Sequence, residues 1–105
     1  MLWYLAAPVL PLGNETLEGN LALAKTYLKA IREAGYNCIA PWIGIIEACG
    51  TDGYAYQLGW ETNLMTIERC DGVFVRGPRI SDGMRKEMQF ADDLDLAVDC
   101  TVRDE

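Results

Sequence analysis

The feature that most constrains the fold is a short apolar run that passes through a Gly/Pro loop into an amphipathic helix. Residues 72–75 (Gly-Val-Phe-Val) are rich in β-branched and aromatic side chains, which predicts a buried strand. Ser81 stands at the N-cap position of the predicted helix, whose apolar residues recur at helical spacing to about Leu94. This arrangement places backbone N–H groups and the positive end of a helix at the carboxyl edge of a sheet, where phosphates and sugars usually bind.

Glu87 is an unusual residue within this predicted helix. At about 100° per residue it falls on the same side as Met84 and Ala91, which is the face turned toward the protein interior. A carboxylate there must be paired, hydrogen-bonded or used in chemistry, because an unsatisfied buried charge is costly. The structural alternative is that Glu87 reaches outward to Arg79 or Lys86.

The rest of the chain repeats the same alternation of strands and helices. Apolar runs predict strands at 2–7, 36–40 and 96–102, and helical periodicity predicts helices at 16–34, closed by Gly35, and at 58–69. The segment 42–56 has no clear period, because glycines and a Thr-Asp pair interrupt it, and its aromatic residues either cover a pocket or merely pack. We therefore predict an α/β fold, a small doubly wound (flavodoxin-like) parallel sheet of about four strands with flanking helices, forming one domain over 1–105.

Composition excludes several classes of function. The chain has 105 residues, a formal net charge of -7 and no histidine. The acidic balance argues against nucleic acid and against an anionic membrane as partners, and no stretch is long enough to span a bilayer. Without histidine, carboxylates and thiols are the remaining candidates for acid–base chemistry. A chain of 105 residues is short for a sheet that has helices on both faces. We therefore expect the protein to bury part of its surface in a homo-oligomer.

Two features of the sequence favour a cytoplasmic protein: the spacing of its cysteines, and an apolar start that does not resemble a signal peptide. The four cysteines lack the paired spacing of zinc sites, so we expect reduced thiols, no metal and no cofactor. Residues 1–10 are apolar but have no basic residue and contain Pro8, which favours a first strand over a signal peptide.

Several short motifs together resemble the nucleoside 2-deoxyribosyltransferase-like superfamily, which includes the 2′-deoxynucleoside 5′-phosphate N-hydrolases and small uncharacterised phage and bacterial members. The resemblance covers nearly the whole chain. Its most specific part is a Ser/Asp-x-Gly-x-x-x-Glu motif, here spanning residues 81–87. The motifs are Tyr-Leu-Ala-Ala-Pro at 4–8, Asn20 and Ala24, Ala40-Pro41, Cys70-Asp71, and Ile-Ser-Asp-Gly-Met at 80–84 followed by Glu87.

The resemblance implies a chemistry for three residues. Glu87 is implied as the nucleophile that attacks the anomeric carbon of a deoxyribose and expels the base, as in a retaining glycosidase. Tyr4 is implied to orient this carboxylate, with a core aromatic residue as the structural alternative. Asn63 aligns with the acid that protonates the base in the family, and an amide can hydrogen-bond a base but cannot protonate it.

The resemblance also implies a site for the sugar and its 5′ group. Ser81 stands where members acting on free nucleosides have Asp and the monophosphate hydrolases have Ser, which favours a 5′-nucleotide; the alternative is that Ser81 is only an N-cap. Gly83 allows close approach of the backbone, and Ala7 replaces a glycine of the characterised enzymes. The other implied binding residues are Pro8, Gly77, Arg79 and Asp82. The alternative for Arg79 is a solvated loop arginine, and Asp82 also suits the first turn of a helix.

Three functions follow from these patterns. The first is cleavage or transfer of the N-glycosidic bond of a 2′-deoxynucleoside 5′-monophosphate, or of a deoxynucleoside. The second is a non-catalytic nucleotide-binding module of the same fold, which the amide of Asn63 would permit. The third is a structural oligomerisation domain. For the first two, the resemblance implies a homo-oligomer in which a neighbouring subunit helps to close the site.

Overall fold

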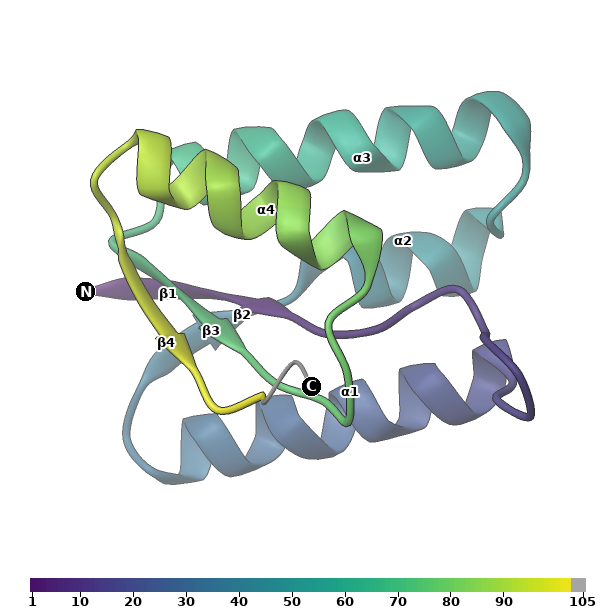
Figure 1. Cartoon of the computed structure of the whole chain (residues 1–105), viewed down its shortest axis with the longest axis horizontal. Coiled ribbons are helices and arrows are strands. Elements are labelled where there is room, and N and C mark those ends of the chain that lie inside the picture. Colours follow the sequence, from purple (N-terminus) through teal and green to yellow (C-terminus); the bar gives the residue numbers. More distant parts are fainter. Residues whose placement is uncertain (103–105) are drawn as a thin grey trace.

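The protein folds into a four-stranded parallel sheet with helices on both faces, as the sequence predicts (Figure 1). The computed structural model describes residues 1–102, apart from the side chains of residues 54 and 55. The strand order is β2-β1-β3-β4. The elements are β1 (Leu2–Ala6), α1 (Leu17–Glu33), β2 (Asn37–Ile39), α2 (Pro41–Cys49), α3 (Gly53–Glu68), β3 (Gly72–Val75), α4 (Asp82–Asp93) and β4 (Ala97–Cys100).

The two faces of the sheet bury two separate sets of side chains, because neighbouring residues of a strand point to opposite faces. The larger set includes Tyr4 of β1 and Val73 of β3, which pair in the sheet and pack with residues of α3 and α4. The smaller set includes Leu5 and Phe74, which pack with Ile31 of α1. Figure 1 shows α1 on one side of the sheet and α3 and α4 on the other. The helix α1 contributes to both sets, since its Leu21 and Ala24 belong to the larger one.

Hydrogen bonds at the N-cap explain where α1 begins after β1 and where α4 begins after β3. The Thr16 hydroxyl oxygen accepts a hydrogen bond from the Gly19 backbone N–H at 2.9 Å at the start of α1. The Ser81 Oγ accepts from the Met84 backbone N–H at 3.2 Å at the start of α4, which confirms the predicted N-cap. Gly35, with φ +100°, follows the end of α1 as predicted.

The start of β1 is fixed to the turn before β3. The Leu2 backbone N–H donates to Asp71 Oδ2 at 2.6 Å, and the Asp71 N–H donates to the Leu2 carbonyl at 2.7 Å. Asp71 therefore has a structural role at the beginning of the β1 and β3 pairing, far from the carboxyl ends of these strands.

The structure corrects two of the sequence predictions. The segment 42–56 contains α2 and the first turn of α3, so the helix predicted from 58 begins at Gly53. The glycine and Thr-Asp signals interrupt the chain only at 50–52, between the two helices, while Gly44 sits inside α2 in open space. The last strand is shorter than the predicted 96–102, and its four residues are exposed because β4 lies at the sheet edge.

No helix in the described part of the chain combines the length and the apolar composition that crossing a bilayer requires.

Substitution of Gly72 by alanine is expected to destabilise the fold. An added Cβ would lie 2.5 Å from Trp3 Cζ3 and 2.9 Å from the Ala97 carbonyl oxygen. The Trp3 side chain cannot move freely, because its ring stacks on that of Phe74 with the ring centroids 4.3 Å apart. We expect Gly72→Ala to lower the free energy of unfolding by about 1–3 kcal/mol, measured by urea denaturation.

The matched control is Gly44→Ala in α2, where nothing lies within 4 Å of the added Cβ. Because alanine favours the helix, this variant should be as stable as the wild type or more stable by up to about 1 kcal/mol. Equal stability of Gly72→Ala and wild type would contradict the packing described for β1 and β3.

Candidate functional site

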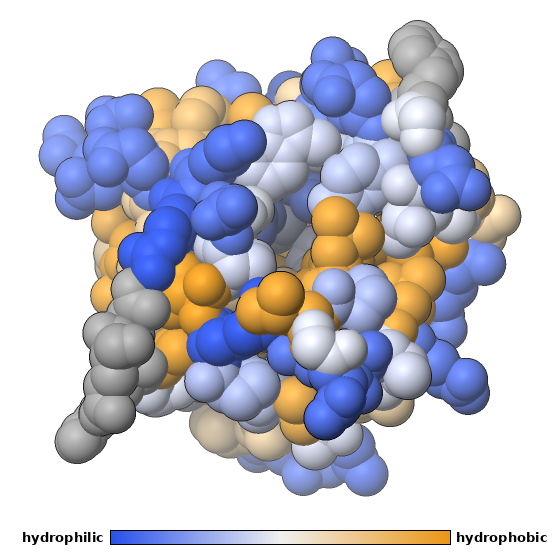
Figure 2. Space-filling view, turned by 45° about the vertical axis from the view of Figure 1, so that its right-hand side comes forward, coloured by the Kyte–Doolittle hydropathy of each residue, from blue (hydrophilic) through white to orange (hydrophobic). Residues whose placement is uncertain are grey.

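A cavity of about 390 Å³ opens at the end of the molecule where β1 and β3 finish. Figure 2 looks toward this end and shows a hollow near the centre of the face, with hydrophobic and hydrophilic atoms on its rim. Its walls come from the loop after β1, from α2 and α3, and from the loop before α4 together with α4 itself. The lining residues are Ala7, Val9, Leu10, Pro11, Leu12, Trp42, Ile45, Ile46, Gly50, Tyr56, Gly59, Trp60, Asn63, Arg79, Ile80, Ser81, Asp82, Gly83, Met84 and Glu87.

Glu87 lines this cavity as a buried carboxyl group. It projects from the inner face of α4, and the residue is only 6% exposed. The hydroxyl of Tyr4, a fully buried residue of β1, donates a hydrogen bond to Glu87 Oε2. The predicted inward orientation of Glu87 is therefore confirmed, and the alternative in which it reaches out to Arg79 or Lys86 is wrong, because Arg79 pairs with Glu15 instead.

Burial changes the acidity of this pair. Loss of hydration raises the pKa of Glu87 to about 7, although the hydrogen bond from Tyr4 acts in the opposite direction. The pKa of Tyr4 is raised well above its usual value, first by burial and then by the adjacent Glu87 carboxylate. Tyr4 thus remains a hydrogen-bond donor, while Glu87 exists in both the protonated and the ionised form near neutral pH.

The start of α4 supplies backbone donors to the cavity. Ser81, Asp82 and Gly83 all line it, and they form the N-cap and first two residues of the helix. Ser81 Oγ accepts the capping hydrogen bond, so its own hydroxyl hydrogen can still be donated elsewhere. The first N–H groups of a helix have no intrahelical partner, and together they favour an anion.

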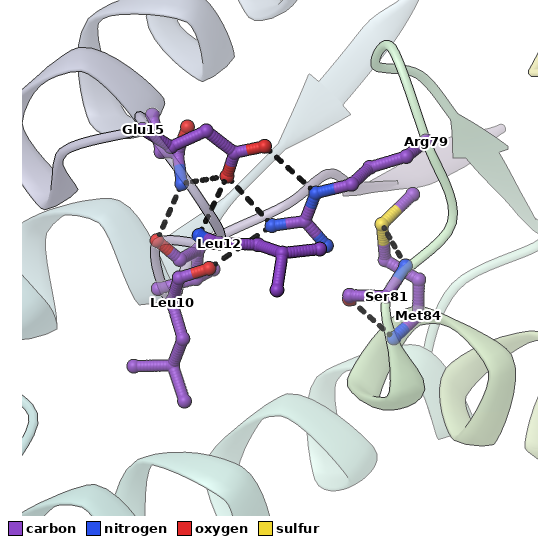
Figure 3. A network of polar contacts seen from close by, with 8 residues as sticks. Leu10, Leu12, Glu15, Arg79, Ser81 and Met84 are labelled. Carbon is purple, nitrogen blue, oxygen red and sulfur yellow. Dashed lines mark hydrogen bonds and ion pairs between the residues drawn. The ribbon is translucent and has the colours of Figure 1, made fainter.

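Arg79 lines the cavity and is held by residues of the loop that follows β1 (Figure 3). Its Nε donates to Glu15 Oε2 at 2.8 Å, and its Nη2 donates to Glu15 Oε1 at 2.7 Å and to the Leu10 carbonyl at 3.0 Å. Hydrogen bonds from Arg79 and then from Asn20 lower the pKa of Glu15 to about 2. Arg79 is therefore a fixed side chain and not a solvated loop residue.

Two residues implied as binding residues lie beside the cavity and do not line it. Gly77 has φ +139° and packs against Pro8, so that a Cβ on Gly77 would lie 2.6 Å from Pro8 Cδ. Pro8 and Gly77 fix the close passage of the loops after β1 and β3, which is a supporting role. Ala7, by contrast, forms part of the cavity wall.

Asn63 lines the cavity from α3. Its Oδ1 is buried and has no hydrogen-bond partner among the residues that the structure describes. A buried acceptor without a partner is uncommon in folded proteins and commonly indicates a missing ligand or water. Asn63 is thus a residue of the cavity wall whose amide oxygen has an acceptor position to fill.

Aromatic residues form part of the cavity wall, which confirms for Trp42 and Tyr56 the first of the two alternatives stated for the segment 42–56, that its aromatic residues cover a pocket. Trp42, Tyr56 and Trp60 line the cavity from α2 and α3, and the Trp42 Nε1 donates to the Leu5 carbonyl at 2.9 Å. The sequence shows many aromatic residues between 42 and 60, but which of them face the cavity depends on the limits of α2 and α3. The sequence did not define these limits, so the two alternatives stayed open. The side chain of Tyr54, another aromatic of this segment, lies outside the described residues.

The chain belongs to a known family whose function has not been assigned. A family model described as "Domain of unknown function (DUF7768)" matches residues 3–101, which is nearly the whole chain. Comparison with curated proteins gives no match. Within the described residues, no three His, Cys, Asp or Glu side chains come together as ligands for a metal ion.

The buried carboxyl group predicts an unusual dependence of stability on pH. Because the pKa of Glu87 rises from 4.5 to about 7 on folding, the native state holds the proton more tightly than the unfolded chain. Stability from this group is complete below about pH 4.5 and is lost as the pH rises to about 7. At pH 8, Glu87→Gln should therefore be more stable than wild type by about 3 kcal/mol, as one pKa unit corresponds to about 1.4 kcal/mol.

Urea denaturation at pH 4 and pH 8 measures this difference. Gln keeps an oxygen that can accept the Tyr4 hydrogen bond, so the two proteins should have nearly the same stability at pH 4. A difference that does not change with pH would show that Glu87 titrates normally.

Proposed function

We propose that this protein cleaves or transfers the N-glycosidic bond of a 2′-deoxynucleoside 5′-monophosphate, or of a deoxynucleoside, with Glu87 as the nucleophile. The observation that carries the proposal is a buried carboxyl group that faces a cavity and is held by a tyrosine hydroxyl. The cavity volume of about 390 Å³ lies within the range of small-molecule sites. The proposal also rests on the resemblance of residues 81–87 to the nucleoside 2-deoxyribosyltransferase-like superfamily.

In the proposed reaction, one oxygen of ionised Glu87 attacks the anomeric carbon of the sugar. The bond from this carbon to the base breaks, its electron pair leaves with the base nitrogen, and a glycosyl ester forms on Glu87. Water or a second base then attacks the same carbon and releases the carboxylate. The Tyr4 hydroxyl orients Glu87 and favours its ionised form, because the hydrogen bond lowers the pKa of the carboxyl group.

The polar and the aromatic walls suit opposite ends of such a ligand. The start of α4 and Arg79 offer hydrogen-bond donors and positive charge for a 5′-phosphate. Trp42, Tyr56 and Trp60 offer flat apolar surfaces for a base. The deoxyribose would then lie between them, beside Glu87.

Asn63 favours a second candidate function, a nucleotide-binding module without turnover. A departing base needs a proton on its nitrogen, and the Asn63 amide in the cavity wall cannot supply one. In the catalytic proposal this proton comes from water. In the alternative, the same cavity holds the nucleotide and the glycosidic bond stays intact.

The proposal includes a cytoplasmic homo-oligomer in which a neighbouring subunit helps to close the cavity. Large apolar side chains remain exposed, namely Leu10 and Leu12 in the cavity wall, and Leu58 and Met65 elsewhere on α3. Burial of such side chains against a second copy would be favourable.

A base-release assay tests the proposed reaction. The protein is incubated with each of the deoxynucleoside monophosphates and with the matching nucleosides, and free base is measured by chromatography. We expect release by the wild type and loss of at least about a hundredfold in Glu87→Ala, because the covalent step needs the carboxylate. If nucleotides raise the unfolding temperature but no base is released, the binding module is the correct function. A ligand at about a hundred times its Kd adds about 2.7 kcal/mol to stability.

The pH dependence of turnover tests the role of Tyr4. Because the ionised form of Glu87 is the nucleophile, kcat/KM should rise with pH and reach half of its maximum near the free protein's pKa of about 7. Tyr4→Phe removes the hydrogen bond that lowers this pKa, so the rise should move to higher pH while activity partly recovers in alkaline buffer. An unchanged midpoint, with lower kcat/KM at every pH, would mean that Tyr4 acts only through packing.

A further inference from the structure

We propose that Glu15 is a positioning residue that holds Arg79 as an anion-binding arm, and that this pair gives the cavity its preference for a ligand with a 5′-phosphate. The inference rests on the proposed function for the identity of the ligand. Neither residue belongs to the element that carries Glu87, since Glu15 precedes α1 and Arg79 precedes α4.

Glu15 is itself fixed by its surroundings. Its carboxylate accepts four hydrogen bonds, from Arg79 Nε and Nη2, from Asn20 Nδ2 at 3.1 Å and from the Leu12 backbone N–H at 3.2 Å. Three of these bonds end on Oε1 and one on Oε2, so donors from three different residues hold the carboxylate in place. Glu15 therefore serves as an anchor for Arg79.

Asn20 connects this anchor to the body of the protein. The residue is only 9% exposed in α1, and its Nδ2 also donates to the Val9 carbonyl at 2.9 Å. One amide thus binds both the carboxylate and the backbone of the loop after β1. The position of Arg79 is consequently set, through Glu15, by a buried residue of α1.

The hydrogen bonds of Arg79 leave one part of its guanidinium for a ligand. Nε and Nη2 donate to Glu15 and to the Leu10 carbonyl, whereas Nη1 has no partner in the described part of the chain (Figure 3). Arg79 lines the cavity and Glu15 does not. The remaining N–H groups of Nη1 are thus the donors that a bound anion can use, and the start of α4 lies on the same cavity wall.

A purely structural clamp predicts a different behaviour. If the ion pair only held the loop in place, its loss would weaken nucleosides and nucleotides alike, because both need the cavity wall. If Glu15 aims Arg79 at a phosphate, its loss weakens only ligands that carry this group. The two possibilities are separated by a matched pair of ligands that differ only in the 5′-phosphate.

The experiment measures Kd by calorimetry in the Glu87→Gln background, so that no turnover occurs. The ligands are a deoxynucleoside 5′-monophosphate, the same deoxynucleoside and inorganic phosphate alone. Glu15→Gln, Arg79→Gln and their combination are compared with the control Glu47→Gln, which removes an exposed ion pair with Lys25 of similar length, 2.6 Å. Far-ultraviolet circular dichroism and thermal unfolding check that each variant is folded.

We expect Glu15→Gln and Arg79→Gln each to weaken the nucleotide and phosphate about tenfold or more, as hydrogen bonds to charged groups contribute about 1.5–3 kcal/mol. The nucleoside should change less than about twofold, since it lacks the charge that Arg79 binds. Because Glu15 acts through Arg79, the double variant should be no weaker than Arg79→Gln alone. The Glu47→Gln control should match its parent.

Arg79→Lys provides a second variant if the neutral ones are unstable. Lysine keeps the ion pair with Glu15 but has a single nitrogen, so it should lose the preference for phosphate while the fold is retained. Equal losses for nucleoside and nucleotide, additive losses in the double variant, or no phosphate binding by the parent would each overturn the proposal. Base release in the wild type is scored separately, so failure of the glycosidic reaction is distinguishable from failure of the positioning role.

Discussion

The hydrogen bond between Tyr4 and Glu87 joins the centre of the sheet to the helix that forms one wall of the cavity. Placing a carboxyl group there costs hydration energy, which is why the pKa of Glu87 rises to about 7. A well-packed apolar residue at this position would give a more stable protein. A destabilising charge that faces a cavity and is held by a tyrosine hydroxyl is the pattern expected of a functional group, and the rest of the fold provides its geometry.

The order of the strands creates the space that this carboxyl group faces. After β1 the chain leaves through α1 toward β2 at one edge, and after β3 it leaves through α4 toward β4 at the other. Because the two loops separate between adjacent strands, a crevice forms at their carboxyl ends, where α/β proteins commonly bind ligands. The contact of Gly77 with Pro8 and the ion pair of Arg79 with Glu15 hold the two loops at a fixed separation.

Local patterns were sufficient to predict much of this arrangement. The limits of β3, the Ser81 cap and the inward direction of Glu87 follow from strand composition, capping chemistry and helical periodicity, which all act over a few residues. The partner of Arg79 did not follow, because Glu15 is 64 residues away in sequence and meets it only after the strands pair. The helix α2 was missed because glycine lies within it and most of its residues are apolar, which obscures a helical period.

Two parts of the chain form the cavity, and they contribute side chains of different chemistry. The charged and hydrogen-bonding groups come from the ends of β1 and β3 and from α4, whereas the aromatic surface comes from α2 and α3. Changes in α2 and α3 can therefore alter the shape of one wall without displacing the carboxyl group or the arginine on the other. Such a division allows members of one family to diverge in the aromatic wall while they keep the same buried carboxyl group.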